Sequence, residues 1–232
     1  MNQPVETITR PTYGQRWTRL VERVPGPVAL LWGITAVLQF VVILRLMSEP
    51  ITSFGSFLAI MGGLWLLQAI QKGLYAPMHD LAYDRHERVS VAHTLGLTLS
   101  RLGAVLRVQV VMVLIFSFIA AVFTFAGAPL FAVFVVLQVV WFLLAPAVYF
   151  AVAHRDTLAA ALGKTWSAGR KNLLWIVGVP GAFWIFSAGL DPFIWSGDDL
   201  LTYLRGASIF LLFGYLRWVA VTAVYAACGR GE

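Results

Sequence analysis

The densest group of side chains capable of chemistry lies in a short polar stretch after the second apolar segment. Its histidines and carboxylates are potential metal ligands and proton-transfer groups. The spacing, however, differs from the helical motif of two histidines four residues apart with a glutamate beside the first. Acids and bases alternate instead, which is typical of a solvated loop with local ion pairs. We therefore predict no metal site, no cofactor and no catalytic residue in this stretch, which comprises His79, Asp80, Asp84, Arg85, His86, Glu87 and Arg88.

Arg217 is the second candidate, because it stands inside a long apolar segment near the C-terminus. A cation at the centre of a membrane costs on the order of 3 kcal/mol, so it should face a partner or a water-filled cavity. We expect it to belong to an anion-binding or ligand-binding group, or to stabilise helix packing. The alternative is that Arg217 extends to a membrane interface beside Trp218. The polar partners in other apolar segments are the amides of Gln68, Gln71, Gln109 and Gln138.

Prolines and glycines inside the apolar segments are candidate breaks in the predicted helices. Pro146 lies in the fourth segment, and Pro180 is followed directly by Gly181 in the fifth. A broken membrane helix frees backbone carbonyls that often line transporter sites, although Pro and Gly are also ordinary in such helices. Gly62 and Gly63 are expected to permit close helix packing.

The amino-acid composition indicates that most of the chain lies in a membrane. Of the 232 residues, 59% are hydrophobic and 12% charged, about half the charged fraction of a soluble domain. The mean hydropathy is +0.79, and a soluble chain of this size could not bury so much apolar surface. We predict an all-α polytopic membrane protein of about six transmembrane helices, since a span needs about 20 apolar residues. The spans are expected near 28–44, 54–74, 108–125, 130–153, 173–190 and 206–227.

The basic residues fall almost entirely on one side of these spans. By the positive-inside rule, both termini and both long connections are cytoplasmic, in a bacterial-type inner membrane. Arg45 and Arg205 are the exceptions on the other side. The net charge of +6 therefore comes from loops, which argues against a nucleic-acid partner. The single cysteine, Cys228, excludes an internal disulfide and a cysteine-based zinc site. We also expect no cleavable signal peptide.

Three stretches mix basic residues with leucine and tryptophan, the pattern of amphipathic helices on a membrane surface. They cover 13–24, 90–107 and 157–172, each before a predicted span. Anionic lipid head groups on the cytoplasmic side are the expected partner, with a cytoplasmic protein or a second copy of the chain as alternatives. We divide the chain into an amphipathic segment, 1–27, and one six-helix domain, 28–232. The predicted membrane-surface residues are Arg16, Arg19, Arg101, Arg107, Lys164, Arg170 and Lys171.

Short motifs recur at matching places and indicate an internal repeat. Ala76-Pro77 is echoed by Ala145-Pro146, and the Ala-Val-Tyr of 147–149 recurs at 223–225. We predict three units, each a surface helix followed by a transmembrane hairpin, because such repeats are common in membrane transport folds.

Segment 141–177 carries a resemblance to a known family. Pro146 is followed by the polar link 154–156 and then by Trp166, Arg170 and Asn172, with a weaker match over 63–121. In these features the chain resembles bacterial six-helix membrane proteins related to the membrane domain attached to some glycerophosphodiester phosphodiesterases. The phosphodiesterase catalytic domain has no counterpart here, so the resemblance implies a fold and no catalytic residue.

Three classes of function fit these observations. We expect a non-enzymatic accessory or scaffold protein that binds lipid or a partner. A small transporter or permease subunit with a separate energising partner is the alternative, because the sequence has no Gly-rich nucleotide-binding loop. An intramembrane enzyme ranks last, since paired carboxylates, a histidine-rich metal set and a Ser/His arrangement within the helices are all missing from the sequence.

Overall fold

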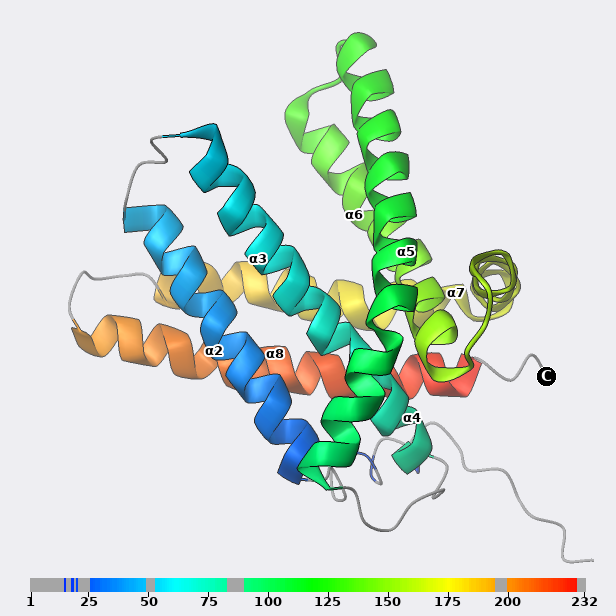
Figure 1. Ribbon diagram of the computed structural model, residues 1–232. Helices are drawn as coiled ribbons and strands as arrows, with labels where there is room; N and C mark the ends of the chain where they lie inside the picture. The colour runs from blue at the N-terminus through cyan, green and yellow to red at the C-terminus, as the bar shows by residue number, and fades with distance from the viewer. Residues whose placement is uncertain are drawn as a thin grey trace, which may run out of the picture.

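The computed structural model describes residues 15, 18, 20, 26–48, 53–82, 90–194 and 200–228, and every regular element in them is an α-helix (Figure 1). Six of these helical stretches are long and apolar enough to cross a membrane, which indicates a multi-pass membrane protein. The helices are α2 (Gly26–Ser48), α3 (Phe54–Gly73), α4 (Tyr75–Ala82), α5 (Val91–Phe125), α6 (Leu130–Ala153), α7 (Leu158–Ile194) and α8 (Leu200–Cys228).

Side-chain caps and turn residues set several helix ends. The hydroxyl of Ser53 accepts a hydrogen bond from the Ser56 amide at 3.1 Å and begins α3, and Ser90 caps α5 in the same way. Such caps satisfy amides that have no partner within the helix. The turn from α5 to α6 contains Gly127 at φ +72°, a conformation open to glycine at no steric cost.

The joint between α3 and α4 follows from Pro77. Proline has no amide hydrogen, so the bond that would run to the carbonyl of Gly73 is missing. The helix therefore ends at Gly73 and restarts at Tyr75. Pro77 itself lies in the first turn of α4, where proline is tolerated.

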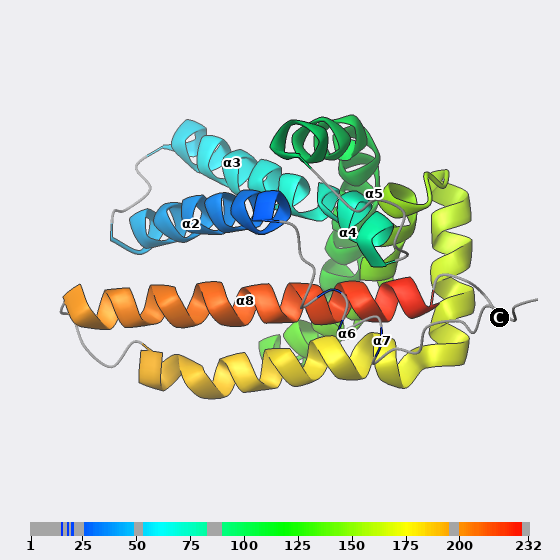
Figure 2. The same cartoon turned by 90° about the horizontal axis from the view of Figure 1, so that it is seen from below.

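Two helices are longer than predicted. Stretch 90–107 and the third span form one 35-residue helix, α5. The 37-residue α7 has non-helical angles at Asn172 (φ −130°, ψ 33°), the last residue of the predicted amphipathic stretch, and Figure 2 shows its two arms at a steep angle.

The prediction of a helix break at the prolines is corrected by this geometry. Pro180 and Gly181 lie inside the second arm of α7 and keep helical angles. Pro146 lies inside α6, which is continuous. A membrane helix can absorb one missing hydrogen bond by bending locally. In α7 the chain instead changes direction at Asn172, where it turns to run beside α8.

The enclosed core lies where the last turns of three candidate spans converge. Segments 73–79, 146–152 and 218–226 are buried at every position. A helix buried on all sides is surrounded by other elements. In contrast, the connected ends of α5 and α6 stand apart from the other helices in Figure 1, and Phe125 and Leu130 there are almost fully exposed. The spans therefore hold together mainly at one end, and their apolar outer surfaces are left for lipid.

Candidate functional site

Three tyrosines meet ring to ring at the centre of this core. Tyr75 comes from α4, Tyr149 from α6 and Tyr225 from α8. Their ring centroids are 5.6 Å apart for Tyr75 and Tyr149, 5.9 Å for Tyr149 and Tyr225, and 6.4 Å for Tyr75 and Tyr225. These distances and the tilted or edge-on angles are the favourable arrangement for aromatic pairs. We call these residues the tyrosine triad; it joins the three buried segments at one point.

A pair of histidines lies against one side of the tyrosine triad. His79, only 3% exposed, shares a hydrogen bond between its Nδ1 and the Tyr149 hydroxyl. The ring of His154, at the C-terminal end of α6, is 4.8 Å from that of His79. The sequence pattern predicted a solvated loop around His79, and this prediction is wrong for that residue. Pro77 restarts the helix, and α4 carries His79 into the core instead of releasing the chain to solvent.

Trp218 extends the aromatic core and is not an interfacial anchor. It is buried, stacks on Tyr75 at 6.2 Å between ring centroids and lies 6.4 Å from Trp32 of α2. The alternative that placed Trp218 at a membrane interface beside Arg217 is therefore wrong for the tryptophan. The indole ring of Trp218 packs between helices and joins α2 to α4 and α8.

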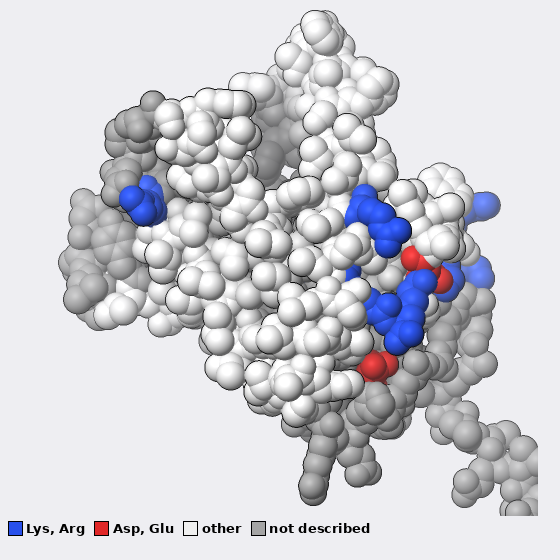
Figure 3. Space-filling view, viewed as in Figure 1, with Lys and Arg blue, Asp and Glu red and all other residues white. Residues whose placement is uncertain are grey.

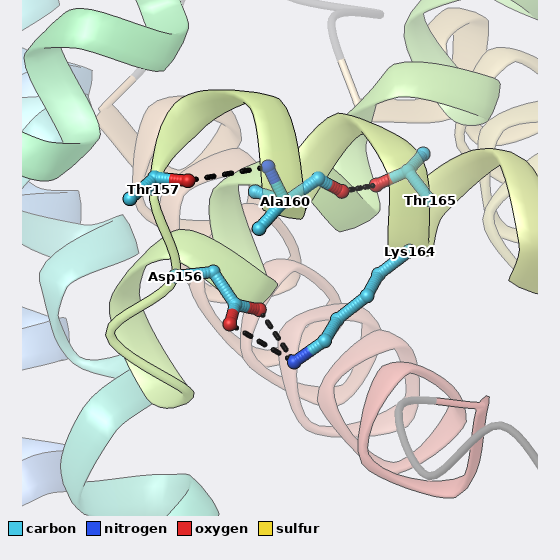
Figure 4. A network of polar contacts seen from close by, with 6 residues as sticks. Asp156, Thr157, Ala160, Lys164 and Thr165 are labelled. Carbon is cyan, nitrogen blue, oxygen red and sulfur yellow. Dashed lines mark hydrogen bonds and ion pairs between the residues drawn. The ribbon is translucent and has the colours of Figure 1, made fainter.

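Charged side chains surround this end of the molecule. Figure 3 shows basic groups gathered with acidic ones around the lower part of α5, while most of the remaining described face is uncharged. Lys164 of α7 forms an ion pair with Asp156 at 2.8 Å (Figure 4). The guanidinium of Arg101 on α5 interacts electrostatically with Arg155 and with Asp80. We call Arg101, Arg155, Asp80, Asp156 and Lys164 the charged rim.

Lys72 carries a buried ammonium group in the last turn of α3. Its Nζ has no hydrogen-bond partner within the described residues and lies 4.5 Å from the centroid of the Trp141 ring. A cation over an aromatic face is stabilised by about 0.5–2 kcal/mol. This interaction stabilises the charge where no carboxylate of the described residues pairs with it.

Arg217 is exposed, although nine consecutive buried residues, 218–226, follow it in α8. Its guanidinium interacts electrostatically with the hydroxyls of Tyr75 and Tyr225. Within the described residues it forms no hydrogen bond to the predicted glutamines. Those amides have different surroundings: Gln68 is exposed, Gln71 accepts a hydrogen bond from Gln39 of α2 at 3.1 Å, Gln138 is half-buried, and Gln109 is buried.

The other predicted surface residues divide into two groups. Arg107, Arg170 and Lys171 are exposed on α5 and α7. Arg16 and Arg19 lie outside the described residues, as do Asp84, Arg85, His86, Glu87 and Arg88 of the polar stretch. In the part of the chain that the structure describes, no three His, Cys, Asp or Glu side chains are grouped to hold a metal ion.

A small pocket lies at the bend of α7. It measures about 190 Å³ and is lined by Asn172, Trp175, Val224, Ala227 and Cys228. Pockets for drug-sized ligands usually exceed about 300 Å³. This one can admit a small group or part of a chain, and it presents one thiol and one amide.

The tyrosine triad, His154 and Arg155 were not selected from the sequence as functional residues. A signal for two of them was present, because Tyr149 and Tyr225 end the two copies of Ala-Val-Tyr. Tyr75 precedes Ala76-Pro77, the other recurring motif. The repeat therefore marked helix ends that converge. No local signal distinguished Arg155 from the other loop arginines.

The architecture and its charged rim define a class: a multi-pass α-helical membrane protein with an aromatic core and polar groups concentrated at one end. Comparisons with known proteins found no matching family model, curated protein or solved structure. The resemblance to the phosphodiesterase-associated membrane domain thus depends on the residues quoted for it. The arrangement of the site supports anion binding and helix packing, because its exposed groups are chiefly cations and its imidazoles and tyrosines are enclosed.

Proposed function

We propose that this chain is a non-enzymatic accessory or scaffold protein of the bacterial inner membrane, which binds anionic lipid head groups at its cytoplasmic end. The observation that carries this proposal is the concentration of charge beside the enclosed core. Arg101, Arg155 and Lys164 lie there, next to the ends of apolar spans. Basic groups beside spans are attracted to anionic lipids by about 1 kcal/mol each.

The proposal also specifies the orientation of the chain in the membrane and its repeated structural units. Both termini lie in the cytoplasm, because the basic connections do. Three hairpins, α2–α3, α5–α6 and α7–α8, act as repeated units, and the first arm of α7 lies along the membrane surface. The convergence of Tyr75, Tyr149 and Tyr225, each from the end of the second span of its unit, supports this. A cytoplasmic protein or a second copy remains an alternative partner for the same surface.

Lipid enrichment around the protein tests the proposal. We expect nanodiscs made from equal parts phosphatidylglycerol and phosphatidylcholine to be enriched in phosphatidylglycerol around the wild-type protein, as measured by lipid mass spectrometry. Substituting Arg107, Arg170 and Lys171 with glutamine should lower the enrichment by up to about fivefold per removed charge. High salt should lower it too, since the Debye length falls to about 3 Å at 1 M.

The matched control keeps the charge at the same positions. Arg107→Lys with Arg170→Lys should leave the enrichment unchanged, because the attraction of anionic lipid depends on the charge. Equal amounts of both lipids around the wild-type protein would exclude the proposed function.

Arg217 favours the transporter as a second candidate. It is an exposed cation within a candidate span, Leu204–Cys228, and interacts with two buried tyrosine hydroxyls. Transport would need a small anion to reach Arg217 and a separate energising partner.

Arg217→Leu separates the two candidates. If Arg217 binds a transported anion, native mass spectrometry should detect a small anion on the wild-type protein that is reduced at least about tenfold in the variant, as expected when one charge-assisted hydrogen bond is removed. Trp218→Phe, which changes the neighbouring buried ring, controls for general damage. A folded variant with the same bound species would remove this support for transport.

A further inference from the structure

Arg101 and Arg155 bring like charges together from two different elements. Arg101 lies one turn beyond Thr98, the residue of α5 against which Gly73 of α3 packs. Arg155 lies in the connection between α6 and α7, and the two guanidinium groups interact with each other. Like charges at close range repel, more strongly where the surroundings are partly apolar. Such a pair is stabilised when an anion lies between its members.

Arg101 also carries a hydrogen-bond donor for which the described residues supply no acceptor. Its Nε is buried and has no hydrogen-bond partner within the described residues. Arg107, two turns further along α5, is the contrast: its Nε donates to the Gly103 carbonyl at 3.2 Å. Buried donors in folded proteins are almost always satisfied, so an unsatisfied one indicates a missing ligand or water. A guanidinium matches the oxygens of a phosphate particularly well.

Arg155 is fixed in position by the residues on either side of it. The His154 amide donates to the Phe150 carbonyl at 3.1 Å, and the His154 ring packs on His79. Asp156 is held by Lys164. Between them Arg155 takes φ 58°, a left-handed conformation in which glycine is the usual residue. Its side chain is exposed, so burial does not explain an arginine here.

The charge of this group selects the kind of anion. Within the described residues, Arg101 interacts with one cation, Arg155, and one carboxylate, Asp80, while Lys164 forms an ion pair with Asp156. Lipid phosphodiesters carry a single negative charge. The group lies at the end of the spans, where a lipid head group would stand.

We infer that Arg101 and Arg155 form a clamp that binds one singly charged phosphate group, supplied by the phosphodiester of a membrane lipid. The inference rests on the proposed function and adds to it a defined site for one lipid molecule, distinct from the general attraction of basic side chains for an anionic surface.

Titration of phosphatidylglycerol into delipidated full-length protein in a neutral detergent tests the clamp by native mass spectrometry. Without a charged bilayer, the general surface attraction is absent. The wild type should bind one lipid molecule preferentially. Arg101→Gln and Arg155→Gly should each weaken that binding at least about tenfold, the effect of removing one charge-assisted hydrogen bond. Arg45→Gln, at the opposite end of its span, should bind as the wild type does.

Arg155→Gly also reports on folding. Glycine relieves the left-handed conformation, so this variant should melt at the same temperature as the wild type or higher. Weaker lipid binding by an equally stable protein would then reflect the loss of the guanidinium. Inorganic phosphate at mildly acidic pH is the second probe: weak binding supports the lipid as the source, whereas binding as tight as that of phosphatidylglycerol would overturn the lipid assignment.

Failure of the clamp can be separated from failure of the proposed function. If both arginine variants bind phosphatidylglycerol as tightly as the wild type, the clamp is wrong, even where the nanodiscs are enriched in that lipid. If the nanodiscs show no enrichment, the proposed function is wrong whatever the arginine variants do.

Discussion

Replacing Tyr149 with alanine is expected to lower the free energy of unfolding by about 3 kcal/mol or more. The side chain is fully buried and touches Tyr75, Tyr225 and His79. Its removal leaves a cavity at the point where three helices meet, and lipid cannot enter to replace the dispersion attraction that the ring supplies there. The measurement is reversible unfolding of the purified protein in mixed micelles with increasing sodium dodecyl sulfate.

Two variants separate the contributions at this position. Tyr149→Phe keeps the ring and removes the hydroxyl that bonds to His79, so it should lower stability by only about 1 kcal/mol. Phe118→Ala removes a ring that is 71% exposed and should have almost no effect, because lipid or detergent already surrounds it. If Tyr149→Ala were as mild as Phe118→Ala, the tyrosine triad would not be the centre of the fold.

The second large effect is expected at Gly73, where α3 packs tightly against α5. A Cβ on Gly73 would lie 2.8 Å from Cγ2 of Thr98 and 3.0 Å from its carbonyl oxygen. The first distance is shorter than real Cβ contacts, the second requires the neighbour to move, and a backbone oxygen cannot move away as a side chain can. Gly73→Val should therefore lower the free energy of unfolding by about 3 kcal/mol, at the upper end of overpacking effects. The same unfolding titration measures it.

A suppressor and a control make this prediction specific. In Gly73→Ala, the added substitution Thr98→Ser removes the Cγ2 clash and should restore part of the stability. Gly63→Ala should be neutral or slightly stabilising, because nothing lies within 4 Å of the Cβ that it would add, and alanine is the better helix former by about 1 kcal/mol. Equal destabilisation by Gly63→Ala and Gly73→Ala would show that the packing of Gly73 on Thr98 is unimportant.

The glycines show which features of helix packing the sequence reveals and which only the structure reveals. The Gly62-Gly63 pair was expected to mark close helix packing, yet both positions are open. The close approach is at Gly73, a single glycine beside a lysine. Small residues permit an approach between helices, but the facing residue decides whether the approach is used. That facing residue, Thr98, is on another helix.

The polar residues show the same difference between local sequence pattern and contacts between distant segments. Local pattern placed His79 in a solvated loop because acids and bases surround it in the sequence. The structure instead encloses it against Tyr149, 70 residues away. Arg155 and Arg101 likewise come together through the packing of α5 against the end of α6. Interactions between distant segments leave no periodic signal in a chain, so sequence reasoning could name the charged residues without pairing them.

The sequence by itself determined the class of protein: six apolar helices, their approximate bounds and the separation of basic from apolar segments. These follow from local physics, since each span must satisfy its own backbone hydrogen bonds and match the thickness of a bilayer. Only the tertiary structure decided that α5 is continuous, that α7 bends at Asn172 and that Tyr75, Tyr149 and Tyr225 meet. Because lipid is as apolar as leucine, hydropathy places helices in the membrane without specifying how they pack. Shape and polar interactions between helices specify it, and they exist only once the helices are assembled.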